Sequence, residues 1–147
     1  MKIISFSYQT TFELDNPAQI KKWMCACLDD LGYIPKEISV AFMDDEALLG
    51  INIEYLKHDY YTDIITFDYS VGNDLSCDIA ISVDRVAENA SIHKTTFEEE
   101  LHRVIIHGLL HCCGYSDKTE DEARGIREKE DEYLTMFHVE PNTQGHV

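Results

Sequence analysis

The sequence predicts a single small α+β domain in which a sheet of about four strands is covered by about five helices. Three observations predict this class: short segments of alternating apolar residues, longer segments with helical spacing between them, and 147 residues without a repeat or a Pro/Gly/Ser-rich linker. A chain of this length buries roughly two-thirds of the surface that its unfolded form exposes. We expect the domain to span residues 1–141, with a loose C-terminal tail over residues 142–147.

The first half of the chain predicts two strands and two helices. Apolar residues alternate over residues 4–8, which indicates a strand. Asn16 then precedes a proline at the first helical position, and a helix with inward apolar residues follows as far as Gly32. Residues 38–42 alternate again as a second strand, and Asp45 is expected to cap a short helix.

The second half predicts two more strands and three helices. Residues 64–69 and 77–83 are separated by a turn-prone segment, so we expect them to pair as a hairpin. Asp84 is expected to cap the next helix. A capping box at Thr96 begins a mostly buried helix that ends at Gly114, and another box over residues 119–122 begins the last helix. The acidic side of that last helix, including Glu128, Glu130, Asp131 and Glu132, is expected to be solvated.

Composition narrows the cellular setting and the partners. The chain has 28 acidic and 12 basic residues, a net charge of −16, which weakens any general affinity for nucleic acid or anionic lipid. Five cysteines without a C-x-x-C motif predict reduced thiols, neither a disulfide framework nor a zinc knuckle. No apolar run approaches the roughly 18 residues of a membrane span, and the N-terminus lacks a secretory signal. We therefore expect a soluble cytoplasmic protein with no membrane partner.

The segment IIHGLLHCCGYSD carries the candidate site. His107 and His111 lie four residues apart on a predicted helix, so both imidazoles can reach one metal ion. Gly108 between them costs about 1 kcal/mol relative to alanine, which predicts a close approach of another segment. Gly114 reverses the chain, and Asp117 is then placed to become a third ligand, leaving one position for water. The alternative is that the histidines are hydrogen-bonded core residues and that Asp117 only begins a turn.

A zinc protease of the H-E-x-x-H type is disfavoured, because Gly108 stands where that motif has its glutamate general base. Cys112 and Cys113 could complete a closed metal shell, but cysteines among apolar helix residues are usually part of the core.

Three stretches together resemble the YbeY family of metal-dependent endoribonucleases and rRNA maturation factors. The first is H-G-x-L-H-x-x-G-Y with Asp117 two residues later; the others are INIEYLKHDYYTDIITF (Ile51–Phe67) and CDIAISVDRVAENA (Cys77–Ala90). The resemblance covers roughly residues 38 to 135 in the same order. It implies a metal held by His107, His111 and, at the position of the family's third histidine, Asp117. One divalent ion, zinc, is expected, although a carboxylate ligand makes a harder cation more competitive.

The family's arginine after the tyrosine is Leu56 here, so Lys57 and His58 are the nearest candidates for phosphate contacts. Thr62, Asp63, Thr66 and Tyr115 also match family positions, and structural roles are expected for them.

The resemblance implies hydrolysis of single-stranded RNA during rRNA maturation and ribosome biogenesis, with rRNA and ribosomal or ribosome-assembly proteins as partners. The missing arginine and the acidic surface leave an alternative: a non-catalytic ribosome-assembly factor with a structural metal site. A hydrolase for another substrate is a third possibility, since fold and metal alone do not name a substrate.

Overall fold

The computed structural model describes the backbone of residues 3–146 and the side chains of residues 3–137. The described part contains four strands and five helices, which confirms the predicted fold class. In chain order the elements are β1 (Ile4–Tyr8), α1 (Pro17–Leu31), β2 (Ile34–Met43), α2 (Asp45–Leu56), β3 (Ile64–Asp68), β4 (Asp74–Ser82), α3 (Val83–His93), α4 (Phe97–Cys112) and α5 (Glu120–His146).

The four strands form one mixed sheet in the order β1-β2-β4-β3. β1 pairs with β2 and β2 with β4 in parallel, and α1 provides the crossover between the first two strands. β3 pairs antiparallel with β4, so the predicted hairpin is confirmed. β3 is therefore an edge strand, and the segment that leads into it lies at the border of the sheet.

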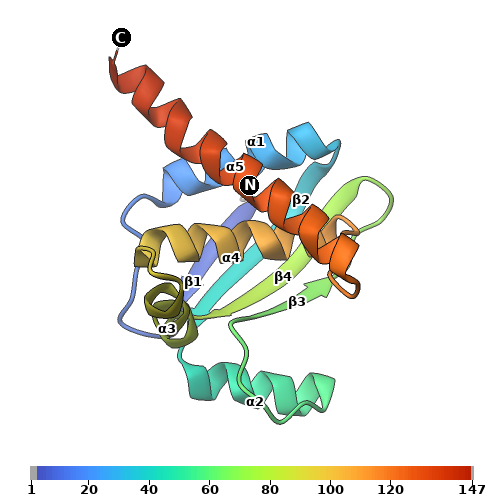
Figure 1. The fold of residues 1–147 in the computed structure, drawn as a ribbon. Helices are drawn as coiled ribbons and strands as arrows, with labels where there is room; N and C mark the ends of the chain where they lie inside the picture. Colours follow the sequence, from blue (N-terminus) through green and yellow to red (C-terminus); the bar gives the residue numbers. More distant parts are fainter. Residues whose placement is uncertain (1–2, 147) are drawn as a thin grey trace.

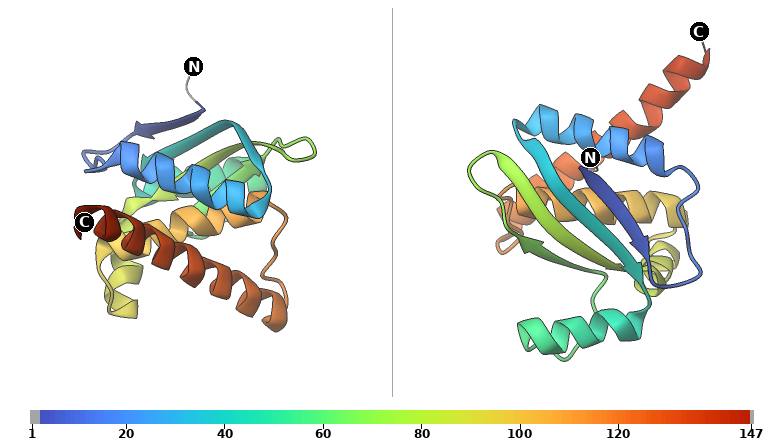
Figure 2. Two further views of the ribbon diagram at one scale, coloured as in Figure 1. Left: turned by 90° about the horizontal axis from the view of Figure 1, so that it is seen from above. Right: turned by 180° about the vertical axis from the view of Figure 1, so that it is seen from behind.

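The helices form layers on the sheet (Figure 1). α1 and α4 cover one face, and α5 lies outside them as a third layer. The view from behind shows that the opposite face is largely uncovered, with α2 near one end (Figure 2). The main core lies between the sheet and α1, α4 and α5; Phe42, Ile81 and Ile105 in it are completely buried.

Gly108 explains how α4 packs so closely against the sheet. A Cβ atom built at this position would lie 2.7 Å from Cδ1 of Ile64 on β3, and 3.4 Å from Cγ2 of Thr66. The sequence prediction that another segment approaches this glycine is confirmed. Its consequence is that the two histidines flanking Gly108 are held near the start of β3.

Two predicted helix caps are wrong by one or two residues. Asp44 caps α2, accepting a hydrogen bond from the backbone N–H of Ala47 at 2.8 Å, and Ser82 caps α3 in the same way through Arg85 at 3.1 Å. Asp45 instead accepts hydrogen bonds from the Ser82 hydroxyl and the Arg85 guanidinium at 2.6 and 2.8 Å. Because these contacts join α2 to α3, long-range pairing decides the roles of the adjacent polar residues.

The backbone of α5 is helical through Pro141 to His146, while the domain limit at residue 141 and the loose tail over residues 142–147 stay predictions. None of the helices among the described residues is both long and apolar enough to cross a lipid bilayer.

Candidate metal centre

His107 and His111 lie on α4, whose sequence fixes its position. The side chain of Thr96 caps the helix by accepting a hydrogen bond from the backbone N–H of Glu99 at 3.1 Å. Leu109 and the other apolar residues of the inner face are buried in the core. The two histidines project from one side of the helix, and their side chains are 26% and 30% exposed. They are therefore not sealed core histidines.

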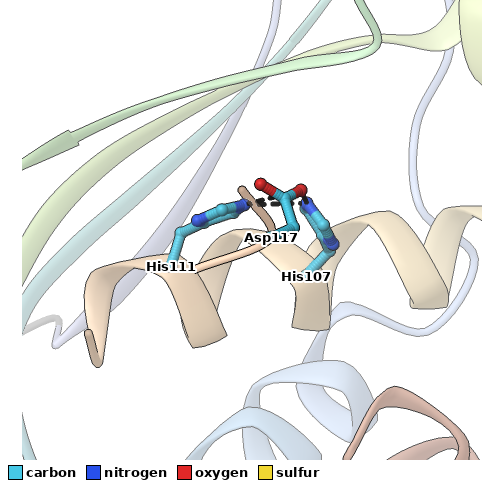
Figure 3. Close-up of side chains that lie close together, drawn as sticks. All are labelled: His107, His111 and Asp117. Carbon is cyan, nitrogen blue, oxygen red and sulfur yellow. Dashed lines mark hydrogen bonds and ion pairs between the residues drawn. The ribbon is translucent and has the colours of Figure 1, made fainter. Parts of the chain in front are cut away.

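Asp117 returns to the two imidazoles after the chain reverses at Gly114, whose φ of 93° suits glycine. Its Oδ2 lies 3.7 Å from Nε2 of His107 and 3.6 Å from Nε2 of His111 (Figure 3). The two Nε2 atoms are 2.9 Å apart. The structure thus brings the three predicted ligands together, with one ligand atom from each residue all within 4.8 Å of one another.

A buried carboxylate lies behind His107. Glu130 on α5 is only 5% exposed, and its Oε2 lies 2.6 Å from Nδ1 of His107. Arg103 donates to the other oxygen of Glu130 at 2.8 Å and to Asp131 at 2.7 Å. The prediction that Glu130 belongs to a solvated face is wrong. Helical spacing could have found it, because Glu130 shares a face with Ile126 and Tyr133, both buried.

This contact determines which nitrogen of His107 is available. When Nδ1 donates to a carboxylate, Nε2 keeps its lone pair for a ligand, the usual arrangement behind metal-binding histidines. Burial disfavours the charged ring, but the hydrogen bond and charge of Glu130, followed by the charges of Asp117 and Asp63, outweigh burial and raise the pKa of His107. A proton and a metal ion would therefore compete for this ring.

Two cavities meet at the cluster, and His107, Asp117 and Asp63 line both. The first, here called the arginine cavity, also contains Arg103, Arg124 and Arg127 in its wall. The second, here called the His58 cleft, is bordered by α2 and the segment before β3, and its wall includes Leu56, His58 and Tyr60. The histidine cluster is thus open to substrate-sized space on two sides.

Of the two predicted phosphate contacts, His58 lies in this cleft and Lys57 is not among the residues that line it. Lys57 ends α2 with a φ of 60°, and its ammonium donates to the carbonyl of Glu54 at 3.3 Å. Leu56 does line the cleft, so this part of the wall is apolar.

Asp63 combines a structural contact with a place beside the cluster. Its backbone carbonyl accepts a hydrogen bond from the N–H of Ser82 at 2.9 Å, and the structural role of its side chain stays a prediction. Burial of its side chain raises the pKa of the carboxyl, while the nearby His107 acts in the opposite direction. The Asn89 amide donates to this carboxyl at 3.4 Å.

The donor set suits a divalent cation. Two imidazole nitrogens and a carboxylate oxygen are ligands that zinc and related ions accept, and Glu130 supplies the supporting carboxylate that such histidines usually have. Fold and site together define a class: a small α+β domain with a candidate centre for one metal ion, open to two cavities.

Comparison with known proteins identifies the family. The family model described as Endoribonuclease YbeY matches residues 4–138. An Endoribonuclease YbeY from Flavobacterium johnsoniae is 51% identical over 138 residues, which cover 94% of this chain and 99% of that protein. Another from Parabacteroides distasonis is 45% identical over 132 residues, 87% of this chain and 93% of that protein. The chain belongs to the Endoribonuclease YbeY family, as its motifs predicted.

A solved structure has the same fold. The solution structure of TM1509 from Thermotoga maritima matches with a TM-score of 0.67 and 23% identity, over 96% of this chain and 93% of that one.

Proposed function

We propose that this chain is a metal-dependent endoribonuclease that cleaves single-stranded RNA in rRNA maturation. Relatives that match nearly its whole length are named endoribonucleases, which supports the activity. The observation that carries the proposal in this chain is the approach of His107, His111 and Asp117 to a common point. A non-catalytic assembly factor is not favoured, because nothing in the names of these relatives points to one.

We assign His107, His111 and Asp117 as the ligands of one divalent ion, with zinc as the first candidate. A bound ion of this kind polarises a phosphoryl oxygen and lowers the pKa of a water molecule toward about 7. The anionic Asp117 in place of a third imidazole lowers the charge that the ion can exert, which favours testing harder cations beside zinc.

The remaining residues of the site orient the ligands and the RNA. Glu130, held by Arg103, fixes the ring of His107 so that Nε2 points to the cluster. His58 remains the better placed of the two phosphate candidates, because it lines the cleft that His107 and Asp117 also line. The contact of Lys57 with phosphate stays a prediction that needs its side chain to leave the carbonyl of Glu54.

The proposed partners are rRNA and ribosomal or ribosome-assembly proteins, and the proposed location is the cytoplasm. A net charge of −16 opposes tight binding to bare RNA, so a partner that presents the strand fits this chain.

Metal analysis and RNA cleavage test the proposal together. We expect freshly purified protein to contain about one divalent ion per chain and to cleave single-stranded RNA, and His111→Ala to lose both the ion and the cleavage. His93→Ala is a matched control for metal content, because His93 lies on α3 outside the cluster and pairs with Glu100. Full cleavage by His111→Ala, or cleavage unaffected by EDTA, would refute the proposal.

A further inference from the structure

We infer that His58 and Tyr60 form a stacking platform for one nucleobase of the RNA, at the mouth of the cleft that leads to His107 and His111. The inference rests on the proposed function, because it identifies how the same site would hold a single strand. The platform lies on the segment that connects α2 to β3 (Figure 1), and both residues line the His58 cleft together with the three proposed ligands.

The two rings already form an ordered pair. Their centroids are 5.1 Å apart with an angle of 19° between the planes, which is a stacked arrangement. The hydroxyl of Tyr60 and Nδ1 of His58 are hydrogen-bonded at 2.9 Å. Tyr60 is nevertheless 56% exposed, so His58 occupies one side of the ring while a large aromatic surface stays open. The bond uses Nδ1 and leaves Nε2 of His58 for the predicted phosphate contact.

A buried side chain holds the platform in place. Asn52 on α2 is 2% exposed, and its amide donates to the backbone carbonyl of Tyr60 at 2.9 Å. The backbone carbonyl of Asn52 accepts a hydrogen bond from the N–H of His58 at 3.1 Å. Both residues of the platform are therefore tied to the same buried asparagine, and little conformational freedom remains to be lost when a base binds.

The chemistry of the cleft favours a base on the open face of the Tyr60 ring. Leu56 makes this part of the wall apolar, and the exposed surface beside it is aromatic. Proteins that bind single-stranded nucleic acid stack unpaired bases on aromatic side chains, and every base offers a flat face for this contact. A base-paired nucleotide cannot stack on the platform without leaving its helix, so the platform would select single strands.

A double-mutant cycle between protein and substrate tests the platform. The KM for a short single-stranded RNA should rise about 5- to 150-fold in Tyr60→Leu, the range for losing one base–aromatic stack, with kcat nearly unchanged. Tyr60→Phe should stay close to the wild type. An abasic nucleotide scanned through the RNA should raise the wild-type KM at one position next to the cleavage site, and at that position Tyr60→Leu should show no further penalty.

Tyr69→Leu is the matched control, because Tyr69 is also largely exposed, at 60%, but lines neither cavity. An unchanged KM in Tyr60→Leu, or an abasic penalty that is the same in wild type and variant, would overturn the inference.

If the metal-loaded wild type cleaves no RNA, the proposed function fails, and binding of a single strand carrying 2-aminopurine then tests the platform separately. Quenching of the 2-aminopurine fluorescence by wild type and by Tyr60→Phe, but not by Tyr60→Leu, would support the platform. Equal quenching by all three proteins would overturn it.

Discussion

Glu130 controls what His107 can offer to a metal ion, although it is no ligand itself. Its buried carboxylate is shared between the imidazole of His107 and the guanidinium of Arg103. A carboxylate so deeply buried is tolerated because both of its oxygens accept charge-assisted hydrogen bonds. The ring of His107 is therefore held in one orientation from α5 before any ion binds.

Glu130→Gln should weaken metal binding about 10- to 100-fold, the usual effect of losing a supporting carboxylate. The variant should also unfold at lower urea concentration, because Arg103 and His107 lose a charged partner in a buried site. Isothermal titration with zinc and urea unfolding measure the two effects. Glu128→Gln, an exposed change on the same helix, should alter neither, and unchanged affinity in Glu130→Gln would contradict the positioning role.

In the metal-free protein, the raised pKa of His107 should make stability depend on pH with a defined sign. The protonated ring is favoured in the fold, so its contribution is complete below the ordinary pKa of 6.5 and is lost as the pH rises through the higher folded value. Thermal unfolding in EDTA between pH 6 and 9 should show this loss in the wild type. Glu130→Gln should show a flatter profile; parallel profiles would disprove the assignment.

The cysteines should be mostly inert. Burial raises the pKa of Cys113 to about 12, and the pKa values of Cys27 and Cys77 are raised as well, so little reactive thiolate forms near neutral pH. Cys25 is the part-exposed member of the five. Ellman's reagent should modify about one thiol in the native protein at pH 8 and five after unfolding. Rapid native reaction at Cys112 would contradict its burial.

At the residue scale, local spacing was sufficient to predict the cluster but not its support. His107, His111 and Asp117 lie within eleven positions, where helix periodicity and one glycine turn determine their approach. The contact between His107 and Glu130 joins two helices, and a run of acidic residues around Glu130 conceals that it faces inward. Only its register with Ile126 and Tyr133 indicated burial.

At the scale of elements, the packing of α4 on β3 depends on the absence of a side chain at Gly108. A methyl group introduced there would place its carbon 2.7 Å from Cδ1 of Ile64, closer than real Cβ contacts, so the isoleucine must move if alanine is introduced. The same contact sets the distance between the histidines and the segment that carries the platform.

Gly108→Ala should therefore cost about 1 kcal/mol, because overpacking exceeds the gain in helix propensity. Ile64→Val removes the methyl group in the way, and in that background Gly108→Ala should become stabilising by up to about 1 kcal/mol. Urea unfolding of the four proteins in EDTA measures the coupling. Gly125→Ala, whose new Cβ would meet no atom within 4 Å, should stabilise the wild type and Ile64→Val equally. If the effects of Gly108→Ala and Ile64→Val on the free energy of unfolding are additive, the contact between these two residues is ruled out.

The order and type of the elements followed from periodicity and turn residues, while their ends did not. β2 begins at Ile34, four residues before the predicted start, because β4 pairs with it as far as Asp74 despite an irregularity between Pro35 and Glu37. The caps of α2 and α3 shifted for a similar reason, since Asp45 bonds across to Ser82 and Arg85. Long-range pairing overrides the local signal in each case.

For the whole molecule, strand order and the distribution of charge are the properties that no local pattern predicted. Parallel pairing of β2 with β4 leaves β3 at the edge, where it packs against α4. The acidic chain also concentrates Arg103, Arg124 and Arg127 in one cavity beside His107. Arg103 is held by Glu130 and Asp131, and Arg124 pairs with Asp121 at 3.0 Å, so Arg127 is the arginine of this wall more available to RNA.

RNA binding should consequently depend weakly on salt. Each phosphate neutralised on a single strand contributes a slope of about −0.7 to log K against log salt concentration, so two or three contacts give about −2. Fluorescence anisotropy of a labelled single strand between 50 and 300 mM KCl measures it. Arg127→Ala should reduce the slope by about 0.7, while Lys36→Ala, an exposed change on β2 away from both cavities, should not. A slope steeper than about −4 would mean that a broad cationic surface binds RNA, against the acidic balance of the chain.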